Sequence, residues 1–133
     1  MFYMDKKNNS LDPWFVTGFC EANALFTYSK YSNGLNLYFA LKFAKNNESL
    51  VDQILCFFSA GKIYKKSEKT MQYRISKIEE IGEVIRHFDL YPLVGQQFNR
   101  YSVWRQMFVI KRDYNMSQKN TLFSLADELS GLS

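Results

Sequence analysis

The stretch from Pro13 to Phe26, PWFVTGFCEANALF, constrains the fold most, because a helical pattern in it runs directly into a strand pattern. Asp12 can cap this helix, and Pro13 suits its first position, where a missing N–H has no consequence. Gly18 and Ala22 are four residues apart and therefore share one helix face. A glycine inside a helix costs about 1 kcal/mol relative to alanine. We therefore expect another backbone to approach this face closely.

Two β-hairpins are predicted from alternating residues. The first pairs residues 25–31 with 36–44 around a Ser32-Asn33-Gly34 turn, and the second pairs residues 62–66 with 71–76. Side chains of one parity are apolar and are expected to face the core. Side chains of the other parity are polar or basic and are expected to form a solvent-facing surface of an antiparallel sheet.

Apolar residues at helical spacing predict further helices over residues 46–58, 78–88 and 97–110, with Pro92 stopping the second, and a loosely docked helix over 117–132. We expect Gly61 to close the first of these, and Ser76 with Glu79 to form a capping box for the second. The order is therefore α-ββ-α-ββ-α-α-α. We expect an α+β fold in one domain over residues 11–133, after a polar tail of residues 1–10.

Composition favours a nucleic-acid or other anionic partner, since the net charge is +4 and the pI is near 9.0. Cys20 and Cys56 lie in apolar helical patterns and are expected to be buried free thiols in a reducing compartment. His87 is expected to be exposed or to compensate a helix dipole. This inventory cannot build a zinc site. No apolar run reaches the roughly eighteen residues of a membrane span, so no membrane partner is expected.

The first ten residues, MFYMDKKNNS, lack the apolar run of a signal peptide and the arginines of a typical transit peptide. The chain is also rich in Lys, Asn and Phe, which fits an A·T-rich organellar gene. We therefore expect an organelle-encoded protein that works where it is made, in a mitochondrion or a chloroplast.

Residues 16–24, VTGFCEANA, resemble the nine-residue motif that names the LAGLIDADG homing endonucleases. The segments Leu11-x-Pro13-Trp14-Phe15, Gly61-x-Ile63-Tyr64 and His87-Phe88-Asp89-x-Tyr91-Pro92-Leu93 are similar to the intron-encoded branch of that family. The resemblance covers roughly residues 11–112, and no second copy of the motif is present in the sequence.

The resemblance implies an αββαββα domain whose antiparallel sheet forms a saddle on the major groove of duplex DNA. Two motif helices, from two subunits or from two halves of one chain, pack side by side through small residues. In this chain those residues are Gly18 and Ala22. A chain with one motif is therefore expected to form a homodimer or to pair with a second LAGLIDADG domain.

The family further implies a carboxylate at the eighth motif position, which holds Mg²⁺ for phosphodiester hydrolysis. This chain has the uncharged Asn23 there, and Glu21 is about 200° away around the helix. Gln97 stands where many relatives carry a lysine. The resemblance therefore implies Asn23 as the metal and catalytic position, with the family acid substituted, and Gln97 as a second catalytic position. Mg²⁺ is expected only if the protein is active, and otherwise no cofactor is expected.

By strand parity, the resemblance also implies a set of nucleic-acid-binding residues on the polar side of the sheet. Lys and Arg supply salt-dependent affinity for phosphates and possible guanine contacts, and Gln72 is suited to adenine. The alternative is that alternation alone produces a solvated sheet face. The candidates are Thr27, Ser29, Tyr38, Lys42, Lys62, Tyr64, Lys66, Gln72 and Arg74.

The expected function is sequence-specific nucleic-acid binding of the LAGLIDADG type, with cleavage weakened or lost at Asn23. One alternative is an active homodimeric Mg²⁺-dependent homing endonuclease. A second is an RNA-binding maturase or a component of an organellar ribonucleoprotein that recognises structured RNA. A third is half of a split enzyme, or a chain in which aspartate was replaced by asparagine to trap uncleaved DNA.

Overall fold

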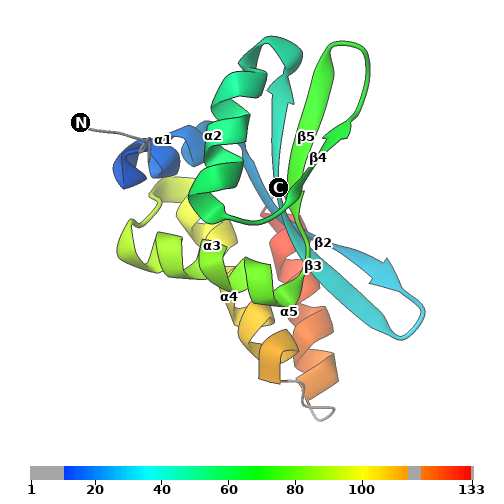
Figure 1. Ribbon diagram of the computed structural model, residues 1–133. Coiled ribbons are helices and arrows are strands. Elements are labelled where there is room, and N and C mark those ends of the chain that lie inside the picture. Colours follow the sequence, from blue (N-terminus) through cyan, green and yellow to red (C-terminus); the bar gives the residue numbers. More distant parts are fainter. Residues whose placement is uncertain (1–10, 114–117, 133) are drawn as a thin grey trace.

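A computed structural model describes residues 11–113 and 118–132 of the chain. The elements follow the predicted order, with a short 3-10 helix η1 before α2 (Figure 1). Their bounds are α1 Pro13–Asn23, β2 Ala24–Tyr31, β3 Gly34–Ala44, η1 Lys45–Asn47, α2 Glu48–Phe58, β4 Lys62–Lys65, β5 Thr70–Ile75, α3 Ile78–Leu90, α4 Gly95–Asp113 and α5 Lys119–Gly131.

The four strands form one antiparallel sheet in the order β2-β3-β5-β4. Both predicted hairpins are present, and the pairing of β3 with β5 joins them into one sheet. The helices gather on one side of the sheet and leave its other side uncovered (Figure 1). We call the uncovered side the outer face. The fold is therefore α+β with an antiparallel sheet, as predicted.

The core lies between the sheet and the helices and is built largely from aromatic rings. Phe26 of β2 is central, with ring centroids of Phe39, Phe88, Tyr101 and Trp104 between 5.2 and 5.6 Å away. The side chain of Trp104 is buried, and its indole N–H donates to the Thr27 carbonyl at 2.9 Å. These contacts attach α3 and α4 to the sheet.

The predicted start of α1 is confirmed, since Asp12 is its N-cap and Pro13 lies in the first turn. The Trp14 amide donates to Asp12 Oδ1 at 2.8 Å. The predicted capping box is wrong, because α3 begins one residue later, with Lys77 as its N-cap and no side-chain cap. The end of α2 also differs from the prediction, because Ser59 and not Gly61 caps it, in the left-handed conformation with φ of 53°.

Gly61 has another role, which only glycine can fill. Its φ is +91°, and a Cβ at this position would lie 2.7 to 2.8 Å from atoms of Tyr73, Arg74 and Ile75. The residue therefore lets the chain pass close to β5 just before it enters β4, where Lys62 pairs with Arg74. This close approach brings β4 alongside β5 in the second hairpin.

Two predictions about single residues are wrong. Cys20 is buried as expected, and burial raises the pKa of its thiol, but Cys56 is exposed on the solvent side of α2. His87 is buried between α3 and α1, where its Nε2 lies 3.0 Å from Thr17 Oγ1. Thr17 donates its hydroxyl proton to the Tyr91 carbonyl at 2.8 Å, so His87 Nε2 must be the donor to Thr17.

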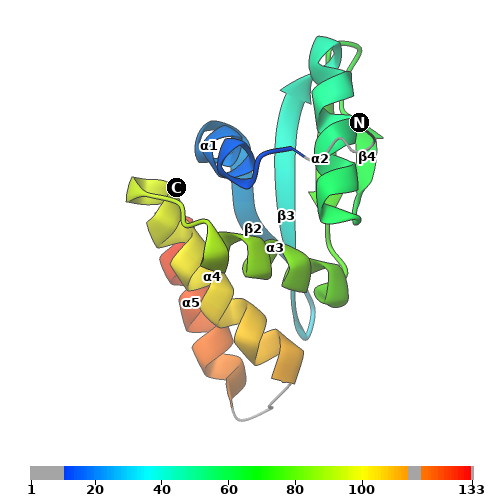
Figure 2. The same cartoon turned by 60° about the vertical axis from the view of Figure 1, so that its left-hand side comes forward.

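Helix α5 runs beside α4 (Figure 2) and buries Leu122, Ala126 and Leu129. The Tyr28 hydroxyl donates to the Ala126 carbonyl at 3.2 Å, so α5 is also attached to β2. The helix is thus docked more firmly than its weak sequence pattern predicts. In the part of the chain that the structure describes, no helix is both long and apolar enough to cross a membrane.

Candidate nucleic-acid interface

One face of α1 lies open to solvent in the single chain. Trp14 and Phe15 on this helix are 57% and 47% exposed, and Gly18 and Ala22 are exposed as well. A Cβ built at Gly18 meets no atom within 4 Å among the described residues. Packing inside the described chain therefore does not account for this glycine.

Asn23 is the last residue of α1, at the position of the family acid. Its side-chain amide donates to the Phe19 carbonyl at 2.9 Å, one turn back. An aspartate could not make this bond, because an ionised carboxylate only accepts. It would also place a negative charge at the helix C-terminus, which is unfavourable. Asn23 thus stabilises the end of α1 rather than presenting a charge.

Gln97 lies in the first turn of α4 and is buried against the same helix end. Its Nε2 donates to the carbonyls of Cys20 and Ala24, both at 3.0 Å. Its Oε1 accepts from Arg100 Nη1 at 3.4 Å. The structure therefore brings Asn23 and Gln97 to the same end of α1, but the amide of Gln97 is fully engaged in holding α1, β2 and α4 together.

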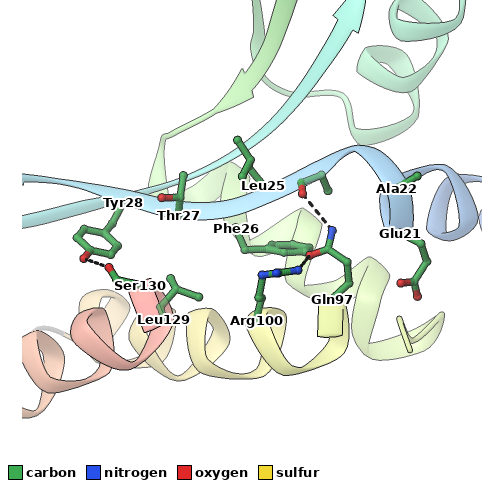
Figure 3. Close-up of a pocket in the computed structure, with 11 residues that line it drawn as sticks. Glu21, Ala22, Leu25, Phe26, Thr27, Tyr28, Gln97, Arg100, Leu129 and Ser130 are labelled. Atoms are coloured by element: carbon green, nitrogen blue, oxygen red, sulfur yellow. Dashed lines mark hydrogen bonds between the residues drawn. The ribbon is translucent and has the colours of Figure 1, made fainter. Parts of the chain in front are cut away.

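A cavity of about 370 Å³ lies beside this helix end, between β2, α4 and α5 (Figure 3). Gln97 and Arg100 point into it from α4, and Glu21 lines it from α1. The Glu21 carboxylate accepts a hydrogen bond from the Val94 amide, so it ties α1 to the segment before α4. Arg100 Nε donates to the Leu132 carbonyl at 3.0 Å. Glu21, Gln97 and Arg100 around this cavity are therefore all engaged in hydrogen bonds within the chain.

The residues at the end of α1 do not fit a magnesium site within one chain. Mg²⁺ requires hard oxygen ligands, usually carboxylates. Asn23 is uncharged and turned onto its own helix, and Glu21 is engaged with the Val94 amide. Within residues 11–113 and 118–132, no three His, Cys, Asp or Glu side chains lie close enough to hold a metal.

The register of the sheet places the strand candidates on the outer face. Thr27 pairs with Tyr38, Lys42 pairs with Gln72, and Gln72 pairs with Tyr64. A central row runs from Leu25 across Ala40 and Arg74 to Lys62. Ser29 lies farther along β2, and Lys66 follows the end of β4, both exposed. Eight of the nine candidates thus share the outer face of the strands, and Lys66 continues it.

All charged residues of the four strands are cationic. The four strands carry five cationic residues, Lys30, Lys42, Lys62, Lys65 and Arg74, and no Asp or Glu. The register places Lys42, Lys62 and Arg74 on the outer face, whereas Lys30 and Lys65 have the opposite parity. The ion pairs between described residues involve Arg86, Arg105 and Arg112, all on the helices. The cations of the outer face are thus not neutralised by neighbouring carboxylates in the described chain, which favours binding of a polyanion.

Gln72 differs from the other candidates because it is only 7% exposed. Its Oε1 accepts two hydrogen bonds from Arg74, from Nε at 3.1 Å and from Nη2 at 2.8 Å. The guanidinium of Arg74 lies over the Tyr38 ring, with Cζ 4.1 Å from its centroid, and 5.7 Å from that of Tyr64. Four of the predicted residues therefore form one cluster.

Sequence reasoning missed three exposed apolar residues near these surfaces. Leu25 is 48% exposed on the outer face, and its parity in β2 was a signal for this position. Val94 and Phe98 are exposed beside the end of α1, where Glu21 holds the Val94 amide. Val94 directly precedes α4, and its carbonyl accepts from the Phe98 amide at 3.3 Å, so the two residues are one helical turn apart. Neither belongs to the buried positions of α4.

A family model described as LAGLIDADG endonuclease matches residues 16–108. A protein of Podospora anserina, an uncharacterised 50.9 kDa protein in ND4 intron 1, is 33% identical over 77% of this chain and 25% of its own length. A probable intron-encoded endonuclease of Schizosaccharomyces pombe, Cox1-I1b, is 30% identical over 84% of this chain and 31% of its own length. The chain thus spans about a quarter to a third of these curated relatives.

Solved structures agree in fold. The LAGLIDADG meganuclease I-AabMI, bound to uncleaved DNA, has a TM-score of 0.81 at 26% identity, over 86% of this chain and 43% of that one. The homing endonuclease I-TnaI has a TM-score of 0.83 at 16% identity, over 93% of this chain and 97% of that one. The solved structures thus show the fold, and the family model and the intron-encoded relatives show that the chain belongs to the LAGLIDADG endonuclease family.

Proposed function

We propose that residues 11–133 act as one LAGLIDADG domain that binds duplex DNA through the outer face of its sheet and does not cut it unaided. The observation that carries this proposal is the charge of the outer face, on which the strands place three cationic residues, Lys42, Lys62 and Arg74, and no acidic one. Lysines and arginines gain affinity from phosphates by releasing the counterions of the DNA. A sheet face that is only solvated is expected to carry acidic as well as basic residues.

The proposed partner of α1 is a second LAGLIDADG helix, from another copy of this chain or from a second domain. Gly18 and Ala22 would let the two backbones come close, and Phe15 flanks them. Such pairing would place two outer faces side by side along one duplex. The exposed small residues, which no described part of the chain covers, support this proposal.

The proposal that cleavage is weakened or lost rests on the end of α1. Asn23 and Gln97 occupy the two positions where the family resemblance implies an acid and a lysine, and both side chains are engaged in hydrogen bonds to backbone carbonyls. A chain with these residues supplies neither the carboxylate for Mg²⁺ nor the cation. We therefore propose no magnesium site in a homodimer of this chain.

The proposed location is the mitochondrion. The relatives from Podospora anserina and Schizosaccharomyces pombe are named after introns of ND4 and Cox1, which are mitochondrial genes. The genomic position of the reading frame tests this proposal. A frame within an intron of a mitochondrial gene supports it, and a frame in a chloroplast or nuclear genome would overturn it.

Binding is tested by measuring affinity for labelled duplex DNA, for a structured RNA and for single-stranded DNA at several salt concentrations. A Lys42→Ala, Lys62→Ala double variant should bind duplex DNA more weakly. The slope of log K against log salt should fall by about 1.8, at roughly 0.9 for each phosphate contact. The matched control is Lys77→Ala with Lys119→Ala, which removes the same charge from two exposed lysines outside the strands.

The outcomes separate the candidate partners. Duplex binding that is lost in the first double variant and kept in the control supports the proposal. Tighter binding of structured RNA than of duplex DNA at every salt concentration would favour the maturase alternative. Equal losses in both double variants would mean that net charge alone attracts the nucleic acid, and that the outer face has no special role.

A further inference from the structure

Arg74 occupies the centre of the outer face. In the row across the sheet it lies between Ala40 of β3 and Lys62 of β4. Ala40 is fully buried although it has outward parity, and its small side chain leaves room above the sheet for the larger Arg74 beside it. A larger residue at position 40 would occupy this space. The sheet is therefore shaped to accept a flat guanidinium in its middle.

Two tyrosines fix the plane of that guanidinium. Its Cζ lies 4.1 Å from the ring centroid of Tyr38, within stacking distance, and 5.7 Å from that of Tyr64. Arginine packs well on aromatic faces because its cation is planar and weakly hydrated. The tyrosines come from β3 and β4, so they hold the side chain from both sides of β5.

Gln72 fixes the rotation of the guanidinium within that plane. Its Oε1 accepts from Nε and Nη2, the two nitrogens along one edge of the guanidinium, at 3.1 and 2.8 Å. Gln72 is nine-tenths buried, so its own position is set by the sheet. The side chain of Arg74 therefore has its orientation determined before any ligand arrives, which lowers the entropy lost on binding.

The end edge of the guanidinium, formed by Nη1 and the second N–H of Nη2, has no hydrogen-bond partner among the described residues. Two parallel N–H groups match the O6 and N7 acceptors that guanine presents in the major groove. No carboxylate of the described chain forms an ion pair with Arg74. The free edge is thus a fork available to a base.

We propose that Arg74 is a specificity-determining residue that reads a guanine, and that Gln72 is a positioning residue that acts through Arg74. This inference rests on the proposed function, namely that the outer face binds duplex DNA. It assigns Gln72 a role different from the adenine contact that its residue type predicts, because its carboxamide oxygen already accepts two hydrogen bonds from Arg74. Tyr38 and Tyr64 serve as the walls that hold the fork.

The experiment is selection of bound duplexes from a randomised DNA library, followed by sequencing. The wild-type protein should enrich guanine at one position, or at two symmetric positions if two copies bind. Replacing that guanine should weaken binding about tenfold to a hundredfold. Arg74→Ala should lose this preference and keep the others, and Arg74→Lys should retain only part of it, because lysine lacks the planar fork.

Gln72 is tested in the same selection. Gln72→Ala should weaken the guanine preference although residue 72 touches no base, and Gln72→Glu should restore it, because a carboxylate accepts the same two N–H groups. Loss of an adenine preference in Gln72→Ala, with the guanine preference intact, would overturn the inference. So would a wild-type protein that binds duplex DNA without any preference that depends on Arg74. A wild-type protein that binds no duplex DNA would instead refute the proposed function.

Discussion

Gly18 allows the stability of the single chain to be separated from its association. A Cβ at this position meets no atom within 4 Å among the described residues, so Gly18→Ala adds no clash inside the chain. Alanine is favoured over glycine in a helix by about 0.8–1.0 kcal/mol. We therefore expect Gly18→Ala to raise the free energy of unfolding of the dilute monomer by this amount. The midpoint of thermal unfolding should rise by about 4 °C.

Association should respond in the opposite direction. In Gly18→Leu the side chain projects from the exposed face of α1, and it should keep a second helix from reaching the backbone. Leucine is nearly as good a helix former as alanine, so the monomer should again become more stable. Sedimentation equilibrium over a range of concentrations measures the dissociation constant, which should rise at least tenfold. Urea unfolding at high dilution measures the stability.

Gly82 provides the matched control. It lies in α3, and a Cβ there makes only an ordinary contact, 3.9 Å from Phe108 Cζ. Gly82→Ala should bring a similar gain in helix stability and leave association unchanged. An unchanged dissociation constant in Gly18→Leu would place the interface elsewhere, and a less stable monomer in Gly18→Ala would refute the argument from open space.

Three more predictions concern residues on α1 or in contact with it. Gln97→Ala should lower the free energy of unfolding by about 1–3 kcal/mol, because the carbonyls of Cys20 and Ala24 lose a buried donor. Gln96→Ala, at an exposed site, should change it little. Equal losses for the two variants in urea unfolding would contradict the role given to Gln97. The wild-type protein should leave bound duplex DNA uncut in Mg²⁺, whereas cleavage would show that Asn23 supports catalysis. Burial lowers the pKa of His87 from 6.5 to about 4, so the unfolded chain binds more protons between these values. Stability relative to His87→Gln should therefore fall as pH drops from about 6.5 to 4, and parallel pH profiles would refute this.

Much of the sheet could be predicted because strands with one buried face repeat every two residues. Leu37, Phe39 and Leu41 are all buried, and their neighbours of opposite parity lie on the outer face, as alternation indicated. The positions of the candidate residues followed from the same parity. Their roles did not, because the contact between Gln72 and Arg74 depends on side-chain directions that residue types alone do not specify.

Helix faces were harder to predict where the partner is distant in sequence. His87 is buried because Thr17, 70 residues earlier, lies against it, and no local pattern around position 87 records that contact. Cys56 was expected in the core because its neighbours in α2 are apolar, but α2 buries only one side, and Cys56 falls on the other. Such errors arise because periodicity describes a helix face and not what covers it.

The central claim, that the outer face binds duplex DNA, is tested most directly by lysine footprinting. The intact protein is acetylated with and without duplex DNA, and the rate at each lysine is read by mass spectrometry. Lys42, Lys62 and Lys66 should be protected by DNA, while Lys77 and Lys119 should react at unchanged rates. Protection of Lys77 and Lys119, with Lys42, Lys62 and Lys66 left reactive, would contradict the account.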